Sequence, residues 1–167
     1  MTAARARKKK RPVRLVAESF TVIHTDHGFD IVAVIPLRLV SEANAHTHWR
    51  QRSTRAKEHR TTVAAYLRRH AFVAVGPLEV VLTRLAPGTL DSDNLAGSAK
   101  HCRDGVADWL GIDDGDARVE WRVTQEPSPH YGVRIVIREM TAARRVADLR
   151  AQLAEAEAAL AAESEAA

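Results

Sequence analysis

Aspartate residues gather in one short part of this chain. Seven of them lie between Gly88 and Asp116, in the stretch GTLDSDNLAGSAKHCRDGVADWLGIDDGD. The two densest patches, DSD and DDGD, lie at the two ends of a segment that is predicted to form one helix. Carboxylates brought together repel and raise one another's pKa, so a cluster of them favours a cation between them. Oxygen ligands with no nearby Cys or His pattern suit a hard ion, Mg²⁺ or Mn²⁺.

The helix between the two patches is predicted to cover residues 94–110 and to end at Gly111. On a helical wheel one stripe is apolar and is expected to face the core, and it includes Cys102, which we therefore interpret as a packing residue. A second stripe carries Asp93, Gly97, Lys100, Asp104 and Asp108. Glycine in mid-helix costs about 1 kcal/mol relative to alanine, and it lets another molecule approach the backbone.

Each acidic residue also has a purely structural interpretation. Asp93 suits a helix N-cap, Lys100 and Asp104 have the spacing of an ion pair, and DDGD suits a turn. Taken together they favour a metal site, because Asp91 and Asp93 would point the same way in an extended segment. The calcium-loop pattern of EF-hands is not met here. A hard metal ion within a basic protein suggests phosphodiester hydrolysis, with Lys100 supplying charge to the reacting phosphate.

The remainder of the sequence supports an anionic partner. The chain has 167 residues and a net charge of +4, with basic segments at MTAARARKKKRPVR and WRQRSTRAKEHR. Such segments suit a nucleic acid, and a solvated arm is the alternative for the first. The single cysteine excludes an internal disulfide and suits a reducing cytoplasm. No apolar run approaches the roughly 20 residues of a membrane span, and we expect no membrane partner.

The fold class expected from hydrophobic periodicity is α/β: a small mixed sheet of four to five strands with two packed helices, followed by an Ala/Glu-rich helical tail. The expected strands cover residues 19–24, 29–37, 78–85, 117–125 and 132–138, and the other helix covers 57–70. Residues 1–14 are expected to form a flexible basic arm, 15–140 the body and 141–167 the tail. The tail has apolar residues at the spacing of a short coiled coil, which would dock on the body, pair with a second chain or fray.

Three motifs in this order, LDSDN, KHCRD and GIDDGDARV, with a strand on each side, resemble the RusA-type Holliday junction resolvases over roughly residues 30–139. The resemblance implies a small α/β nuclease domain, a homodimer, Mg²⁺ dependence and symmetric cutting of four-way DNA junctions. The N-terminal arm and the tail have no counterpart in the family, and contacts with a second copy or with a partner are a candidate role for the tail. A bacterial or phage-infected cell is the expected setting, with the protein in the cytoplasm.

The resemblance also assigns roles to residues. Asp91, Asp93 and Asp114 match the metal-binding catalytic carboxylates, with Asp113 as a less certain member. Lys100 matches the catalytic lysine, although the family usually has its lysine at the position of Gly97. Asn94 and Asp104 match flanking positions. Candidate DNA contacts are Asn44, Arg50, Arg52 and Asn94. The His46/His48 pair is assigned to DNA contact or a plain loop, with a metal pair as the alternative. Trp49 is assigned to the core or an interface, with stacking on an unpaired base as the alternative. The alternative function is a non-catalytic DNA-binding or interaction protein that keeps this fold.

Overall fold

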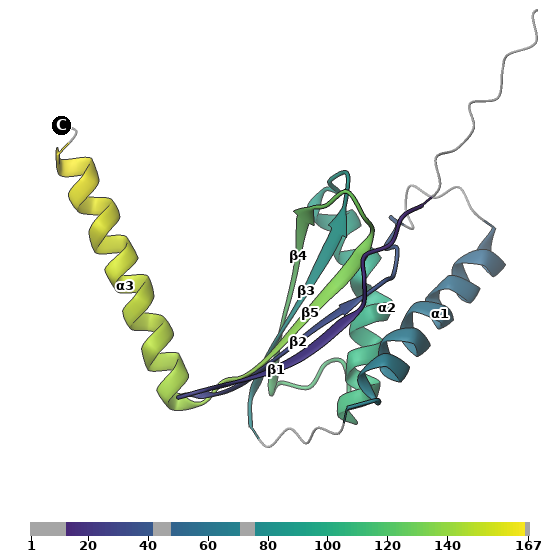
Figure 1. Ribbon diagram of the computed structural model, residues 1–167, viewed down its shortest axis with the longest axis horizontal. Coiled ribbons are helices and arrows are strands. Elements are labelled where there is room, and N and C mark those ends of the chain that lie inside the picture. Colours follow the sequence, from purple (N-terminus) through teal and green to yellow (C-terminus); the bar gives the residue numbers. More distant parts are fainter. Residues whose placement is uncertain (1–12, 42–47, 71–75, 166–167) are drawn as a thin grey trace, which may run out of the picture.

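The computed structural model describes residues 13–41, 48–70 and 76–165. Five strands and three helices make up this part of the chain (Figure 1). In chain order they are β1 (Ser19–Thr25), β2 (Gly28–Ile35), α1 (Trp49–Leu67), β3 (Leu78–Ala86), α2 (Ser92–Leu110), β4 (Val119–Pro127), β5 (Gly132–Glu139) and α3 (Ala142–Glu165). The expected fold class is confirmed.

The five strands form one mixed sheet in the order β1-β2-β5-β3-β4. β3 and β4 are parallel, and the other neighbours are antiparallel. α1 and α2 lie side by side on one face of the sheet, while α3 projects away from the body (Figure 1). Because β2 and β3 run in the same direction, the segments that follow them start at the same edge of the sheet, which we call the upper edge. Both helices start on this side of the sheet, but their starts lie farther apart than their ends, where the two helices meet (Figure 1).

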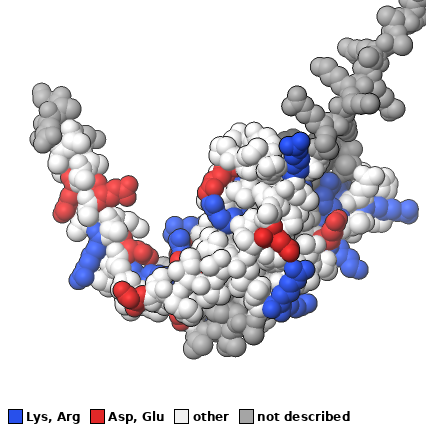
Figure 2. Space-filling view, viewed as in Figure 1, with Lys and Arg blue, Asp and Glu red and all other residues white. Residues whose placement is uncertain are grey.

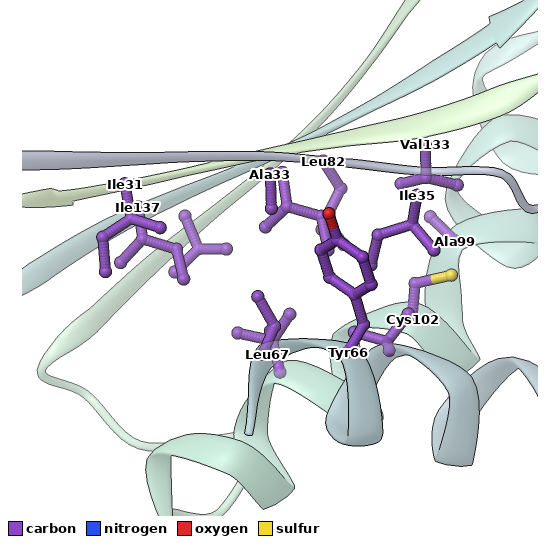
Figure 3. Packing of buried hydrophobic residues seen from close by; sticks show 14 of the residues in the cluster. Ile31, Ala33, Ile35, Tyr66, Leu67, Leu82, Ala99, Cys102, Val133 and Ile137 are labelled. Carbon is purple, nitrogen blue, oxygen red and sulfur yellow. The ribbon is translucent and has the colours of Figure 1, made fainter. Parts of the chain in front are cut away.

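The core lies between the sheet and these two helices. Alternate residues of β2 and β5 point toward the helices and are almost fully buried, as period-two patterning predicts. In Figure 3, Ile31, Ile35 and Val133 from the sheet face Tyr66 and Leu67 from α1. The apolar stripe expected on α2 faces this core, so the part of the sequence analysis that placed Cys102 among packing residues is confirmed.

Cys102 gives a test of this packing. Complete burial raises the pKa of its thiol to about 12, because the thiolate would lose its hydration. We expect a thiol reagent at pH 8 to leave the native protein unmodified, and to modify it fully in denaturant. The measurement is the mass of the protein after timed alkylation. Rapid modification without denaturant would show that the core opens readily around α2.

Gly105 lies where α2 crosses α1. A Cβ atom added there would come within 2.6 Å of the Arg60 carbonyl oxygen and 2.9 Å of the Val63 Cβ. Such distances are too short for carbon, so only glycine allows the two helices to approach this closely. Arg60 also joins the helices through Asp108, with two nitrogen–oxygen distances of 2.6 and 2.7 Å. This pair raises the pKa of Arg60 and lowers that of Asp108.

The start of α1 differs from the expectation. The helix begins at Trp49, eight residues before residue 57. The side chains from Trp49 to Thr54 are all exposed, so no apolar periodicity marks this part of the helix. The helix ends at Leu67, three residues before the expected position, and Arg68 is its C-cap. The other elements agree with expectation to within two residues at each end.

Both ends of the body extend slightly past their expected limits. Arg14, assigned to the arm, accepts a hydrogen bond from the backbone N–H of Tyr131, and Val16 donates one to the carbonyl of Tyr131. Contacts with the body therefore begin before residue 15. At the other end, Arg144 in the first turn of α3 is buried and pairs with Asp30 at 2.7 Å, which anchors the base of α3 to β2.

The sheet face that no described helix covers carries paired charges. Arg138 reaches both Asp30 and Glu79, and Arg122 reaches both Glu79 and Glu120, at distances between 2.8 and 3.6 Å. The row alternates in sign from β2 to β4. Since each arginine already has carboxylate partners, this face offers little free positive charge to a polyanion.

Candidate functional site at the upper edge of the sheet

Asp91 caps the N-terminus of α2 at the upper edge. One carboxylate oxygen accepts the backbone N–H of Asn94 at 2.9 Å, and the other accepts the Asn94 side-chain amide at 2.7 Å. These two hydrogen bonds lower the pKa of Asp91, so the group is ionised across the physiological range. The cap is thus Asp91 and not Asp93, which corrects the structural interpretation given from the sequence.

Asp93 lies in the first turn of α2, not in an extended segment. The alternation expected for Asp91 and Asp93 therefore does not apply. Both side chains are exposed, and both lie at the positive end of the helix dipole, which favours negative charge. They remain neighbours at one helix end, with oxygen atoms available to solvent.

Asn94 and Ser41 hold this end in place. The Ser41 hydroxyl donates to the side-chain oxygen of Asn94, and the side-chain amide nitrogen of Asn94 donates to Asp91. Ser41 follows β2, so this chain of bonds ties the loop after β2 to the first turn of α2. The Asn94 side chain therefore positions Asp91, and a contact between Asn94 and DNA stays a prediction.

Two strand residues that the sequence analysis did not single out hold the loop before Asp91. Gln125 on β4 pairs with both backbone groups of Leu90, at 2.8 and 2.7 Å. Arg84 on β3 donates from Nη1 to the carbonyl of Gly88 at 2.7 Å. The sequence did carry a signal for both residues: each is a polar residue at a strand position where the alternation predicts an apolar side chain facing the helices. Asp91 is thus positioned from β3, β4 and the loop after β2 together.

Arg84 carries a buried positive charge. Only 7% of its surface is exposed, and its Nε is buried without a hydrogen-bond partner in the part of the chain that the structure describes. Burial lowers the pKa of Arg84, Tyr131 acts in the opposite direction, and the neighbouring Arg38 adds to the lowering. No carboxylate pairs with Arg84 among the described residues. A buried cation without a counter-ion is costly, and an anion bound at this edge would relieve that cost.

Asp114 lies at the other end of α2. The turn that contains it follows the C-terminus of the helix, where the Asp114 carbonyl accepts a hydrogen bond from Arg103. Asp113 accepts the backbone N–H of Gly115 at 2.8 Å and so acts as a turn residue. With a rise of about 1.5 Å per residue, α2 separates Asp114 from Asp91 by roughly 20 Å or more.

The expected convergence of Asp91, Asp93 and Asp114 on one ion is therefore wrong for a single chain. Asp91 follows the end of β3, and Asp114 precedes the start of β4, which runs parallel to β3, so the two residues lie at opposite edges of the sheet. Within the described ranges, no group of three or more His, Cys, Asp or Glu side chains is arranged to hold a metal ion.

In the second stripe of α2, the residues nearer the N-terminus are free of ion pairs in the described structure, and those nearer the C-terminus form ion pairs. Gly97 and Lys100 are exposed, and nothing lies within 4 Å of the place where a Gly97 Cβ would be. Asp104 pairs with His101 at 3.3 Å, and Asp108 pairs with Arg60 of α1. The expected partner of Asp104 was Lys100. Lys100 remains about 10 Å along the helix from Asp93.

The start of α1 brings exposed basic residues to the same edge. Arg50 and Arg52 lie in its first turns, next to Trp49, which is 60% exposed. Trp49 is therefore not a core residue. His48 caps the helix through its Nδ1, which accepts the N–H of Arg50 at 3.3 Å. In Figure 2, blue side chains line the side of the body where α1 lies. Asn44 and His46 fall outside the described residues.

A comparison of the sequence with models of protein families and with curated proteins finds no match. The helices within the described ranges include none with the length and apolar character needed to cross a bilayer.

Proposed function

We propose that this protein is a Mg²⁺-dependent endonuclease that cuts branched DNA, with four-way junctions as the leading substrate, and that it acts as a homodimer. One observation carries the proposal: at one edge of the sheet lie two exposed carboxylates and a buried arginine that has no carboxylate partner among the described residues. Carboxylates suit the metal, and the guanidinium suits a phosphate. The resemblance in the three acidic motifs gives the substrate class.

Asp91 and Asp93 are the residues that would hold the ion. When bound, Mg²⁺ supplies charge neutralisation at the phosphate and activation of a water molecule. Asn94 and Ser41 fix the direction of the Asp91 carboxylate, so this group is already held in place before the substrate binds. The exposed arginines at the start of α1 would contact phosphates on either side of the cut.

A second chain would supply the third carboxylate. If two copies lie with their α2 helices antiparallel, Asp114 of one copy comes to the end of α2 that carries Asp91 and Asp93 of the other. A two-fold axis creates two such sites, which suits symmetric cutting of two strands. The separation of these residues within one chain supports this composite arrangement.

The direct test is incubation of purified protein with a synthetic four-way junction and with a linear duplex of the same sequence. We expect cleavage of the junction in the presence of Mg²⁺, and none after chelation. Absence of cleavage with either Mg²⁺ or Mn²⁺, over a range of protein concentrations that includes the dimer, would contradict the proposal.

The second candidate is a non-catalytic DNA-binding protein with the same fold. The displaced lysine favours it, because Gly97 stands at the family's usual lysine position and Lys100 comes three residues later. It predicts salt-sensitive DNA binding that survives, or improves, when Asp91 and Asp93 are changed to Asn, because negative charge is removed from the DNA-facing edge. Cleavage that depends on these aspartates would exclude it.

Changing Arg84→Met tests the buried arginine. Because methionine removes an uncompensated buried charge and fills similar space, thermal stability should be unchanged or higher. Junction affinity or cleavage should fall about tenfold or more, since a charge-assisted hydrogen bond to phosphate contributes about 1.5–3 kcal/mol. Junction titration and a melting curve measure the two effects.

The matched control is Arg122→Met, an arginine on the neighbouring strand that pairs with Glu79 and Glu120 on the other face. It should leave junction affinity unchanged. Arg84→Lys keeps the charge and should recover part of the affinity. Equal losses in the Arg84 and Arg122 variants, or a folding defect in Arg84→Met alone, would assign Arg84 a purely structural role.

A further inference from the structure

The outer part of α3 exposes an apolar seam. Val146, Leu149, Leu153 and Leu160 each have between 47% and 68% of their surface exposed. They follow the alternating three- and four-residue spacing of a coiled coil, with Ala156 completing the series. Every described side chain from Asp148 to Ala162 is exposed. A contiguous row of exposed apolar side chains marks an interaction surface, so a partner is expected to cover the seam.

The base of α3 is fixed while its seam is free. Arg144 pairs with Asp30 and also donates to the carbonyls of Phe29 and Glu139, at 3.2 Å each. Thr141 donates to the carbonyl of His27 at 2.8 Å. These contacts set the direction in which α3 leaves the body (Figure 1). The helix is therefore presented to another molecule and is not folded onto its own sheet.

The residues that flank the seam indicate which partner fits. With Val146 and Leu153 at heptad position a, the flanking e positions hold Arg150 and Glu157, and the g position before Val146 holds Arg145.

The orientation of the pair decides which of these charges meet. In a parallel pair of α3 helices, position g faces position e of the partner, so Arg145 would meet Arg150 of the second copy. In an antiparallel pair, e faces e, so Arg150 meets Glu157 twice by symmetry. Charge complementarity therefore favours the antiparallel pair.

The same charges fix the register. With Leu149 packed against Leu160 of the partner and Leu153 against Ala156, four layers form and both Arg150–Glu157 pairs are made. A shift of one heptad in either direction would place Arg150 against Arg150, or Glu157 against Glu157. The small Ala156 side chain allows close approach of the two helices at the centre.

We propose that α3 pairs antiparallel with α3 of a second copy of this chain, centred between Leu153 and Ala156. This contact is separate from the α2 contact of the homodimer proposed above, because α2 and α3 lie on opposite sides of the sheet (Figure 1). Its test reads the contact itself and not DNA cleavage, so either proposal can fail without the other.

Cysteine pairs test the orientation in the full-length protein. A variant with Arg150→Cys and Glu157→Cys should form a covalent dimer with a short bifunctional thiol reagent, because these positions face each other only in the antiparallel pair. The matched variant, with Arg145→Cys and Arg150→Cys, would cross-link only in a parallel pair. All these positions are exposed, so folding should be retained, and the native chain with its buried Cys102 is the blank. Cross-linking of the 145/150 variant alone, or of neither variant, would overturn the proposal.

Charge reversal gives a second, independent readout. Arg150→Glu should weaken self-association about tenfold, since two attractive pairs become repulsive. Adding Glu157→Arg should restore it, because the pairs then form with the signs exchanged. Sedimentation over a range of concentrations measures the dissociation constant. Stronger association of Arg150→Glu would indicate a parallel pair, and a chain that stays monomeric throughout would assign the seam to a different protein; both results would refute the antiparallel dimer.

Discussion

Mixing two inactive variants, Asp93→Asn and Asp114→Asn, is expected to restore junction cleavage. Each variant alone should lose cleavage by about 100-fold or more, because loss of even an outer partner of a metal ligand costs about 10–100-fold. In a composite site, a heterodimer of the two variants has one site with both substitutions and one site with none. Random exchange of subunits makes about half of the dimers heterodimers, so about a quarter of the sites recover. Cleavage of a labelled four-way junction, after the two variants are refolded together, measures this.

The matched control mixes Asp91→Asn with Asp93→Asn. Both residues belong to the same end of the same chain, so every site in that heterodimer lacks one carboxylate and no activity should return. If the Asp93/Asp114 mixture also stays inactive while wild type cleaves, the three carboxylates do not act across two chains. If Asp114→Asn alone cleaves at the wild-type rate, Asp114 is no part of the site.

Gly105→Ala is expected to destabilise the protein, although alanine is normally the better helix residue. The new methyl group would lie 2.6 Å from a backbone oxygen of α1, which forces the two helices apart. Overpacking of this kind costs about 1–3 kcal/mol, more than the roughly 1 kcal/mol gained in helix propensity. Thermal denaturation should show a melting temperature lower by several degrees.

Gly97→Ala is the matched control, on the same helix but with no atom within 4 Å of the added carbon. It should gain up to about 1 kcal/mol from helix propensity alone. The two substitutions are chemically identical, so opposite signs would isolate the effect of the helix crossing. Equal stabilisation by both would show that α1 and α2 are not in close contact at Gly105.

Much of the fold followed from local patterns in the sequence. Alternating apolar residues in β2 and β5, and the apolar stripe on α2, located their elements because each has one buried face. Gly111 ends α2 in a left-handed conformation, as expected for a helix C-terminus. The start of α1 was missed because its first turns are exposed on every side, and their residues therefore show no apolar periodicity.

The candidate site was only partly predictable. The sequence identified Asp91 and Asp93 as a chemical pair, because residue type and spacing along the chain are enough to place two groups at one helix end. It could not identify Arg84, whose importance comes from burial beside a loop that lies several residues further along the chain. It also named Asp93 as a suitable N-cap, whereas the backbone geometry gives that position to Asp91.

What the sequence determined by itself is therefore local: where most strands and helices lie, which faces are apolar, and which acidic and basic residues are gathered. What only the tertiary structure decided is how distant segments meet. A rigid helix keeps Asp114 away from Asp91 within one chain, and the sheet topology brings the starts of α1 and α2 to a common edge. The spacing of residues along the chain determines which side chains meet within one turn of a helix. The packing of helices and strands against one another determines which carboxylates lie close enough to share an ion.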